Sequence, residues 1–86
     1  MLEKQIPKSL KNLDAEKEMK LLGLRIKELR KKKGYTSYET FANEHDIHRV
    51  QWGRYESGQD LYFSTLVKII KVLNVTIEEF FSEGFK

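Results

Sequence analysis

Apolar residues in this chain of 86 residues recur three and four positions apart, and no stretch of useful length alternates apolar with polar residues. Because an α-helix turns once in about 3.6 residues, this spacing places apolar side chains on one face of a helix, whereas a strand needs a period of two. We therefore expect an all-α fold. The length allows one domain at most, since a single core commonly spans about 50 to 200 residues.

The first predicted helix is marked by an apolar stripe of Met19, Leu22, Ile26 and Leu29. Asp14 or Asn12 would cap its start, and Gly34 would stop it. Arg25 is expected on an outward face of this helix, together with the other charged residues of the segment.

Two pairs of residues with capping-box spacing, Thr36 with Glu39 and Thr76 with Glu79, predict the starts of two further helices. In such a box the hydroxyl and the carboxylate each bond a backbone N–H that the first helical turn leaves unpaired. The first box places a helix from about Ser37, and the second places a short helix near the end of the chain.

Two more helices are predicted between these boxes. One covers residues 48–56 and ends at Gly58, and the other carries a stripe of Phe63, Leu66, Ile70 and Leu73. We expect a compact five-helix bundle over residues 19–82, an N-terminal arm or helical extension over residues 1–18, and a tail over residues 83–86.

The second and third predicted helices are short and closely connected. Phe41 and Ala42 lie on one, Ile47 lies in the connection, and Trp52 and Tyr55 lie one turn apart on the other. With this spacing, two short helices pack at a steep angle around a common set of apolar side chains. The sequence therefore predicts a helix-turn-helix.

At these stretches the chain resembles the Cro and lambda-repressor type of helix-turn-helix domain, often called the XRE family. The similar stretches are LGLRIKELRKKKGYTSYETFA, EHDI, HRVQWGRYESG and TLVKIIKVLNVTIEEFF. The family's typical residues occur in order as Arg30, Ala42, Ile47, Glu56 and Gly58. Asp46 stands where the family's turn usually has glycine.

The resemblance implies that the third helix enters the major groove of DNA. The residues expected to read bases are Arg49, Val50, Gln51, Gly53 and Arg54. Arginine can bond guanine through two N–H groups, valine can contact a thymine methyl, and Gln51 can read adenine or bond a phosphate. Gly53 suggests that something approaches the helix closely there, or that Trp52 and Arg54 need steric relief.

Phosphate contacts are expected on both sides of the third helix. Backbone N–H groups around Ser37 and Tyr38 would form an anion site at a helix start. His48 would touch a phosphate or cap the third helix, and the resemblance adds Ser57 and Gln59.

Arg30 and Glu56 resemble the family's internal ion pair, which ties the first helix to the end of the third. The lysines that follow Arg30 are interpreted mainly as charges that complement the helix dipole, and alternatively as a second phosphate contact.

The charge is uneven along the chain. Its formal total is +3, with +6 in residues 1–34 and −3 in residues 35–86. A basic half suggests a nucleic-acid or acidic partner, although a lysine-rich helix face is commonly just solvated. The acidic second half is the best argument for an alternative, a protein-interaction module such as an antitoxin subunit or adaptor.

Enzyme and metal functions are not expected. The chain has no cysteine, and its one metal-like grouping, the two histidines of segment 44–48 with Glu44 and Asp46, lacks the four ligands of a structural zinc site. There is no glycine-rich phosphate loop or persuasive catalytic triad, and no cofactor is implied.

The sequence therefore favours a sequence-specific regulator of transcription that binds double-stranded DNA. Without a long apolar segment, it is expected in the cytoplasm and not in a membrane. With one recognition helix per chain, it is expected to act as a homodimer on a near-palindromic site. Phe80, Phe81 and Phe85, or the N-terminal arm, are the candidate dimer contacts, although at least one of Phe80 and Phe81 is expected in the core.

Overall fold

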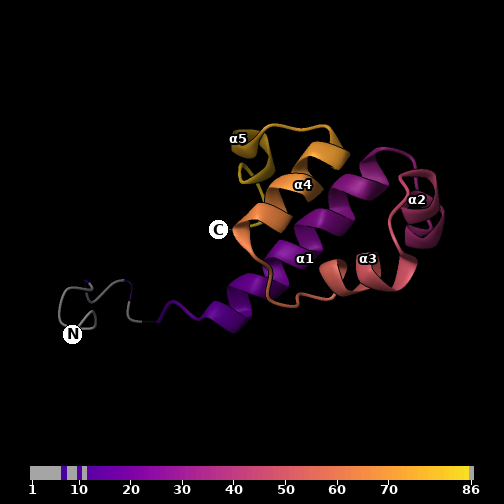
Figure 1. Ribbon diagram of the computed structural model, residues 1–86. Coiled ribbons are helices and arrows are strands. Elements are labelled where there is room, and N and C mark those ends of the chain that lie inside the picture. The colour runs from indigo at the N-terminus through magenta and orange to yellow at the C-terminus, as the bar shows by residue number, and fades with distance from the viewer. Residues whose placement is uncertain (1–6, 8–9, 11, 86) are drawn as a thin grey trace.

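The computed structural model describes residues 7, 10 and 12–85, and within them the chain is all-helical, as the sequence predicts (Figure 1). Of the expected arm or extension over residues 1–18, residues 1–6, 8, 9 and 11 lie outside the described residues, and residues 15–18 belong to the first helix. The helices are α1 (Ala15–Lys32), α2 (Tyr38–Glu44), α3 (Arg49–Glu56), α4 (Phe63–Leu73) and α5 (Ile77–Phe80). No described helix is both long enough and apolar enough to span a bilayer.

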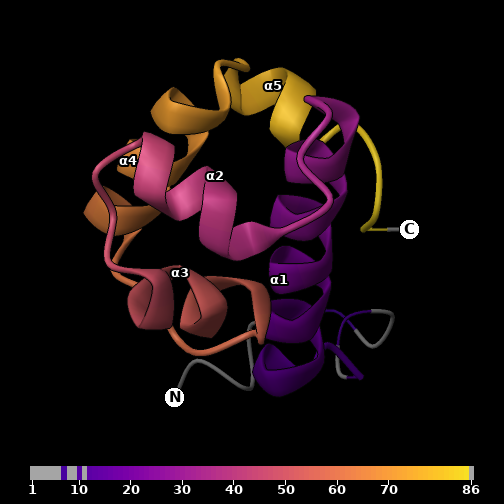
Figure 2. The same ribbon diagram turned by 90° about the vertical axis from the view of Figure 1, so that its right-hand side faces the viewer.

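The long helix α1 forms the centre of the fold. It packs against α2 and α3 on one side and against α4 on another, while α5 packs against the end of α4. Figure 2 shows α2 and α3 as two short helices crossing in front of this frame. The architecture is therefore a small bundle that presents a helix-turn-helix on one side.

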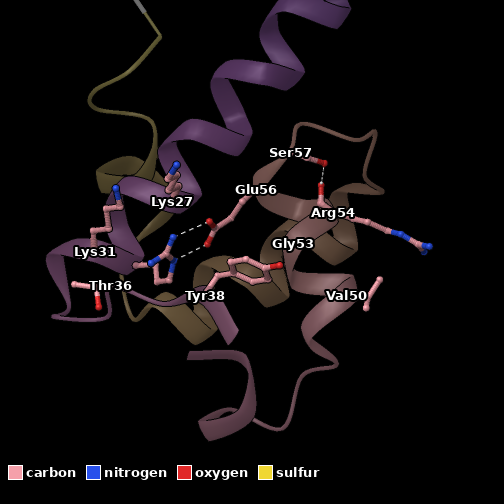
Figure 3. Close-up of a pocket in the computed structure, with 10 residues that line it drawn as sticks. Lys27, Lys31, Thr36, Tyr38, Val50, Gly53, Arg54, Glu56 and Ser57 are labelled. Carbon is pink, nitrogen blue, oxygen red and sulfur yellow. Dashed lines mark hydrogen bonds and ion pairs between the residues drawn. The ribbon is translucent and has the colours of Figure 1, made fainter. Parts of the chain in front are cut away.

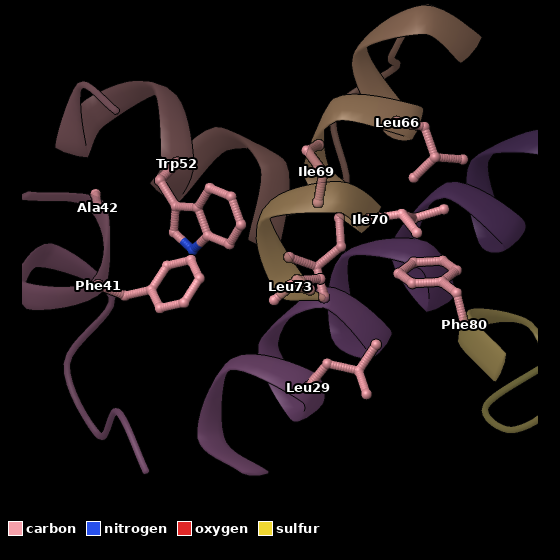
Figure 4. Close-up of a cluster of buried hydrophobic side chains, with 10 residues drawn as sticks. Leu29, Phe41, Ala42, Trp52, Leu66, Ile69, Ile70, Leu73 and Phe80 are labelled. Atoms are coloured by element: carbon pink, nitrogen blue, oxygen red, sulfur yellow. The ribbon is translucent and has the colours of Figure 1, made fainter. Parts of the chain in front are cut away.

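The core joins these helices through ten buried apolar residues (Figure 4). They are Ile26, Leu29, Phe41, Ala42, Trp52, Leu66, Ile69, Ile70, Leu73 and Phe80. Trp52 stacks near Phe41 with ring centroids 4.9 Å apart, so α3 is seated on α2 by an aromatic pair. Phe80 is fully buried, which makes it a core residue and removes it from the candidate dimer contacts.

The predicted stripe of α4 is wrong at its first position. Phe63 is 66% exposed, and Ile69 is buried instead. Phe63 is the first residue of α4, and side chains of a helix lean toward its N-terminus, so this ring points beyond the core.

The predicted cap of α2 is wrong by one residue. Ser37, not Thr36, is the N-cap, and its hydroxyl accepts a hydrogen bond from the Thr40 N–H at 3.3 Å. By contrast, Asp14 caps α1, and Thr76 caps α5 by accepting from the Glu79 N–H at 3.0 Å.

Arg25 is not on an outward face, contrary to the prediction. It is 3% exposed, and its Nε and Nη2 donate to the carbonyls of Phe80 and Glu79 at 2.7 and 2.8 Å. It also pairs with Glu28 and, at 3.5 Å, with Glu83. A helical pattern cannot anticipate this burial, because the acceptors are more than fifty residues away in the sequence.

Two glycines let α1 cross the end of α3 closely. A Cβ atom added at Gly23 would lie 2.8 Å from the Gly58 nitrogen, and one added at Gly58 would lie 2.9 Å from the Lys20 Cα. Gly58 also has a φ of +89°, which glycine adopts at no steric cost. These positions fix how the end of α3 sits against α1.

Candidate nucleic-acid interface

The connection between α2 and α3 is a tight turn. Asp46, at the position where the family usually has glycine, adopts a φ of +56°, which aspartate tolerates better than most residues. The Ile47 N–H donates to the Ala42 carbonyl at 2.9 Å, and Ile47 packs against the core. The turn therefore fixes where α3 begins relative to α2.

The two faces of α3 differ sharply. Trp52 is fully buried and Tyr55 is half-buried, with ring centroids 5.7 Å apart. On the other face Val50 is 49% exposed and the Arg49 side chain is 65% exposed. The other exposed side chains of this helix include Gln51 and Arg54. The helix thus has an anchored side and an outward row that can approach a partner.

An ion pair anchors α3 to α1. Arg30 donates through Nε to Glu56 Oε2 at 2.7 Å and through Nη2 to Oε1 at 2.9 Å, and its Nη1 donates to the Tyr35 carbonyl at 2.7 Å. The Trp52 indole N–H also donates to Glu56, at 2.6 Å. The side chains of Arg30 and Glu56 are 2% and 9% exposed. This two-pronged geometry restricts rotation of the helix end.

Gly53 is approached closely by the protein itself. A Cβ atom added there would lie 3.2 Å from the Tyr38 Cε1 atom, and Figure 3 shows the Tyr38 ring beside this point of α3. Glycine at this position therefore accommodates a ring from α2. The spacing of residues in the sequence carries no signal for Tyr38 as the neighbour of Gly53.

The predicted phosphate contacts lie around the two ends of α3 and the start of α2. Ser37 is partly buried as the cap of α2, and Tyr38 is 38% exposed. Ser57 ends α3, with its hydroxyl donating to the Arg54 carbonyl at 2.8 Å, and Gln59 is exposed.

His48 precedes α3, but it is not a side-chain cap. It occupies the N-cap position without a capping hydrogen bond from its ring, so the predicted capping role is wrong. Its ring is exposed. Imidazole accepts poorly in the geometry that a short hydroxyl or carboxylate side chain provides at this position.

A hollow of about 650 Å³ lies between α1 and α3 (Figure 3). It brings together both residues of the predicted ion pair, Arg30 and Glu56, and five of the predicted DNA contacts, namely Tyr38, Val50, Gly53, Arg54 and Ser57. It also includes Lys27, which sequence reasoning missed, and Lys31, one of the lysines interpreted alternatively as a second phosphate contact. The other candidates, Ser37, His48, Arg49, Gln51 and Gln59, do not line it.

Two further ionic features lie near α2. Arg49 Nη1 is 3.9 Å from Glu39 Oε2, and both side chains are largely exposed. The Glu44 side chain raises the pKa of Tyr35 above its ordinary value, chiefly through its hydrogen-bond interaction with the hydroxyl. Across the described residues, no three potential metal-ligating side chains come together.

Residues 26–80 match the family model described as helix-turn-helix, which is well over half of the chain. The span contains the turn, both arms of the ion pair and the whole of α3. No significant match was found among curated proteins or solved structures.

Proposed function

Because this chain belongs to the helix-turn-helix family, of the Cro and lambda-repressor type, we propose that it is a sequence-specific regulator of transcription that binds double-stranded DNA. The proposal rests on the difference between the two sides of α3. Its inner side is held by Trp52 and by the Arg30–Glu56 pair, while its outward row stays exposed. To read base edges, a helix must be held firmly on one side and must expose side chains on the other.

The proposed base-reading residues are those of the outward row. Arg49 and Arg54 would bond guanine O6 and N7, Val50 would contact a thymine methyl, and Gln51 would read adenine or hold a phosphate. Gly53 would keep the α3 backbone close to Tyr38, which leaves less room for a base at that point.

Backbone phosphates would be held on both sides of this row. The N–H groups at Ser37 and Tyr38 would hold one strand, since the start of a helix attracts anions. His48, Ser57 and Gln59 would complete the contacts around α3.

We further propose a cytoplasmic homodimer on a near-palindromic site. One recognition helix reads only a few base pairs, so two copies on half-sites about 34–36 Å apart would supply specific affinity. Phe81 and Phe85 remain the candidate dimer contacts of the C-terminal segment, with ring centroids 5.1 Å apart.

The test is selection of bound fragments from random duplex DNA, followed by Arg49→Ala on the selected site. We expect a loss of about 1–3 kcal/mol in binding and relaxed preference at one base pair. Lys71→Ala, on the exposed surface of α4, is the control and should leave that preference intact. An equal loss by R49A on every sequence would make Arg49 a phosphate contact instead.

A protein-interaction module is the second candidate. It is favoured by the −3 charge of residues 35–86 and by the exposed aromatic pair Tyr62 and Phe63 before and at the start of α4. Such a module would bind duplex DNA neither selectively nor with a steep dependence on salt. Fluorescence anisotropy with the selected duplex at several salt concentrations distinguishes the two candidates.

A further inference from the structure

The hollow between α1 and α3 has an unusual distribution of charge. Its lining contains four basic residues, Lys27, Arg30, Lys31 and Arg54, and one acidic residue, Glu56. The formal charge of this lining is thus +3, equal to that of the whole chain.

The acidic residue in the lining is already occupied. Glu56 accepts hydrogen bonds from Arg30 and from the Trp52 indole, so its negative charge is already paired within the protein. The positive charge that is left comes from Lys27 and Lys31 on α1 and from Arg54 on α3. Figure 3 shows the two lysines on one side of the ion pair and Arg54 on the other.

Among the described side chains, four basic residues have a carboxylate partner and eight do not, and three of those eight line the hollow. Arg25, Lys32 and Arg49 each have a carboxylate partner, as Arg30 has. Among the described side chains, Lys27, Lys31 and Arg54 form no such pair. Their charge is therefore available to an anion that comes from outside the molecule.

The helix dipole does not account for the two lysines together. Lys31 is in the last turn of α1, where a cation is favourable, but Lys27 lies more than a turn before the helix end at Lys32. Like charges four residues apart on a helix also repel each other. An anion between the two ammonium groups would relieve this repulsion.

We propose that this hollow binds one phosphate of the DNA backbone, held by Lys27 and Lys31 from α1. The inference rests on the proposed function and adds a contact to it. The opposite wall of the hollow is formed by Val50, Gly53 and Arg54, so a strand read by α3 would pass over the hollow. The Tyr38 and Thr36 hydroxyls line the same space and can donate to phosphate oxygens.

The experiment compares K27Q/K31Q with K68Q/K71Q, which removes the same charge from α4. Binding to a random duplex and to the selected duplex is measured from 0.1 to 1 M salt. Loss of one phosphate contact should reduce the slope of log affinity against log salt concentration by about 0.9. Between 1 M and 0.1 M salt, the affinity of the variant should therefore rise about eightfold less than that of the wild type. The loss should be equal on both duplexes. The control should keep the wild-type slope, because Lys68 and Lys71 do not line the hollow.

K27R/K31R keeps the charge and should restore the wild-type slope, which separates charge from helix packing. If K27Q/K31Q keeps the wild-type slope, the contact is absent although DNA binding stands. If the wild-type protein binds no duplex, the proposed function fails and the contact fails with it.

Inorganic phosphate provides the final arm. We expect inorganic phosphate to compete with the duplex for the hollow. The competition is measured by NMR, from the amide chemical shifts around Lys27 and Lys31. Saturation of the hollow by inorganic phosphate with no change in duplex binding would assign the hollow to a free anion and overturn the proposal.

Discussion

Two arginines buried on α1 hold different halves of the molecule. Arg30 is 2% exposed and holds α3 through a carboxylate that is itself buried. Arg25 is 3% exposed and holds the end of α5 through two backbone carbonyls, while its acidic partners Glu28 and Glu83 lie near the surface. Burial alone does not tell what an arginine contributes, because the partner decides what is lost when the contact breaks.

The difference has a physical basis. A buried carboxylate and a buried guanidinium each need the other, since either one left alone would be an unpaired charge in a medium of low polarity. A carbonyl that loses its donor is a neutral group and is less costly to leave unpaired. The proposed DNA-binding half should therefore fail more abruptly than the C-terminal half.

The largest expected effect is that of Glu56→Gln. It leaves Arg30 buried without a countercharge and should lower the free energy of unfolding by about 3–5 kcal/mol, and it should also weaken DNA binding. Urea titration followed by circular dichroism measures the first quantity. Glu28→Gln removes an exposed partner of Arg25 and should cost less than about 1 kcal/mol. Equal losses of unfolding free energy in E56Q and E28Q would contradict the difference proposed between Arg30 and Arg25.

An intermediate effect is expected for Arg25→Met. The Phe80 carbonyl loses the donor at 2.7 Å, and the expected cost is about 1–3 kcal/mol. Hydrogen exchange should rise mainly in residues 77–82, while affinity for duplex DNA stays within twofold of wild type. A large loss of DNA binding by a folded variant would show that the C-terminal half also sets the position of α3.

The smallest effect is expected at an exposed arginine. Arg49 lies 3.9 Å from Glu39, and an exposed pair of this kind contributes about 0–1 kcal/mol to stability. Glu39→Gln should leave the melting temperature nearly unchanged and increase the association rate with duplex DNA, because it removes a negative charge beside the proposed base-reading row. Glu78→Gln, on α5, is the matched control. A slower association of E39Q would indicate that Glu39 positions Arg49 for binding.

Local sequence signals predicted much of the fold. The apolar stripe of α1, the caps at Asp14 and Thr76 and the glycine stop at Gly34 all depend on residues a few positions apart. The shift from Thr36 to Ser37 at the start of α2 arose because two adjacent hydroxyl residues can both cap a helix and tertiary packing selects between them.

Contacts between distant segments were harder to predict. The Arg30–Glu56 pair came from the family resemblance, and the burial of Arg25 came from no pattern at all. The contact of Tyr38 with Gly53 depends on the angle between α2 and α3, which periodicity does not specify. The grouping of Lys27 and Lys31 with Arg54 likewise requires α1 and α3 to be placed side by side.

The only tryptophan of the chain lies at the joint between these segments, fully buried and bonded through its indole N–H to Glu56. Indole emission shifts to longer wavelength when the ring meets water. The intrinsic fluorescence of Trp52 therefore reports, without any added label, whether α3 is packed against the core, and it can be followed in the same cuvette as unfolding or titration with DNA.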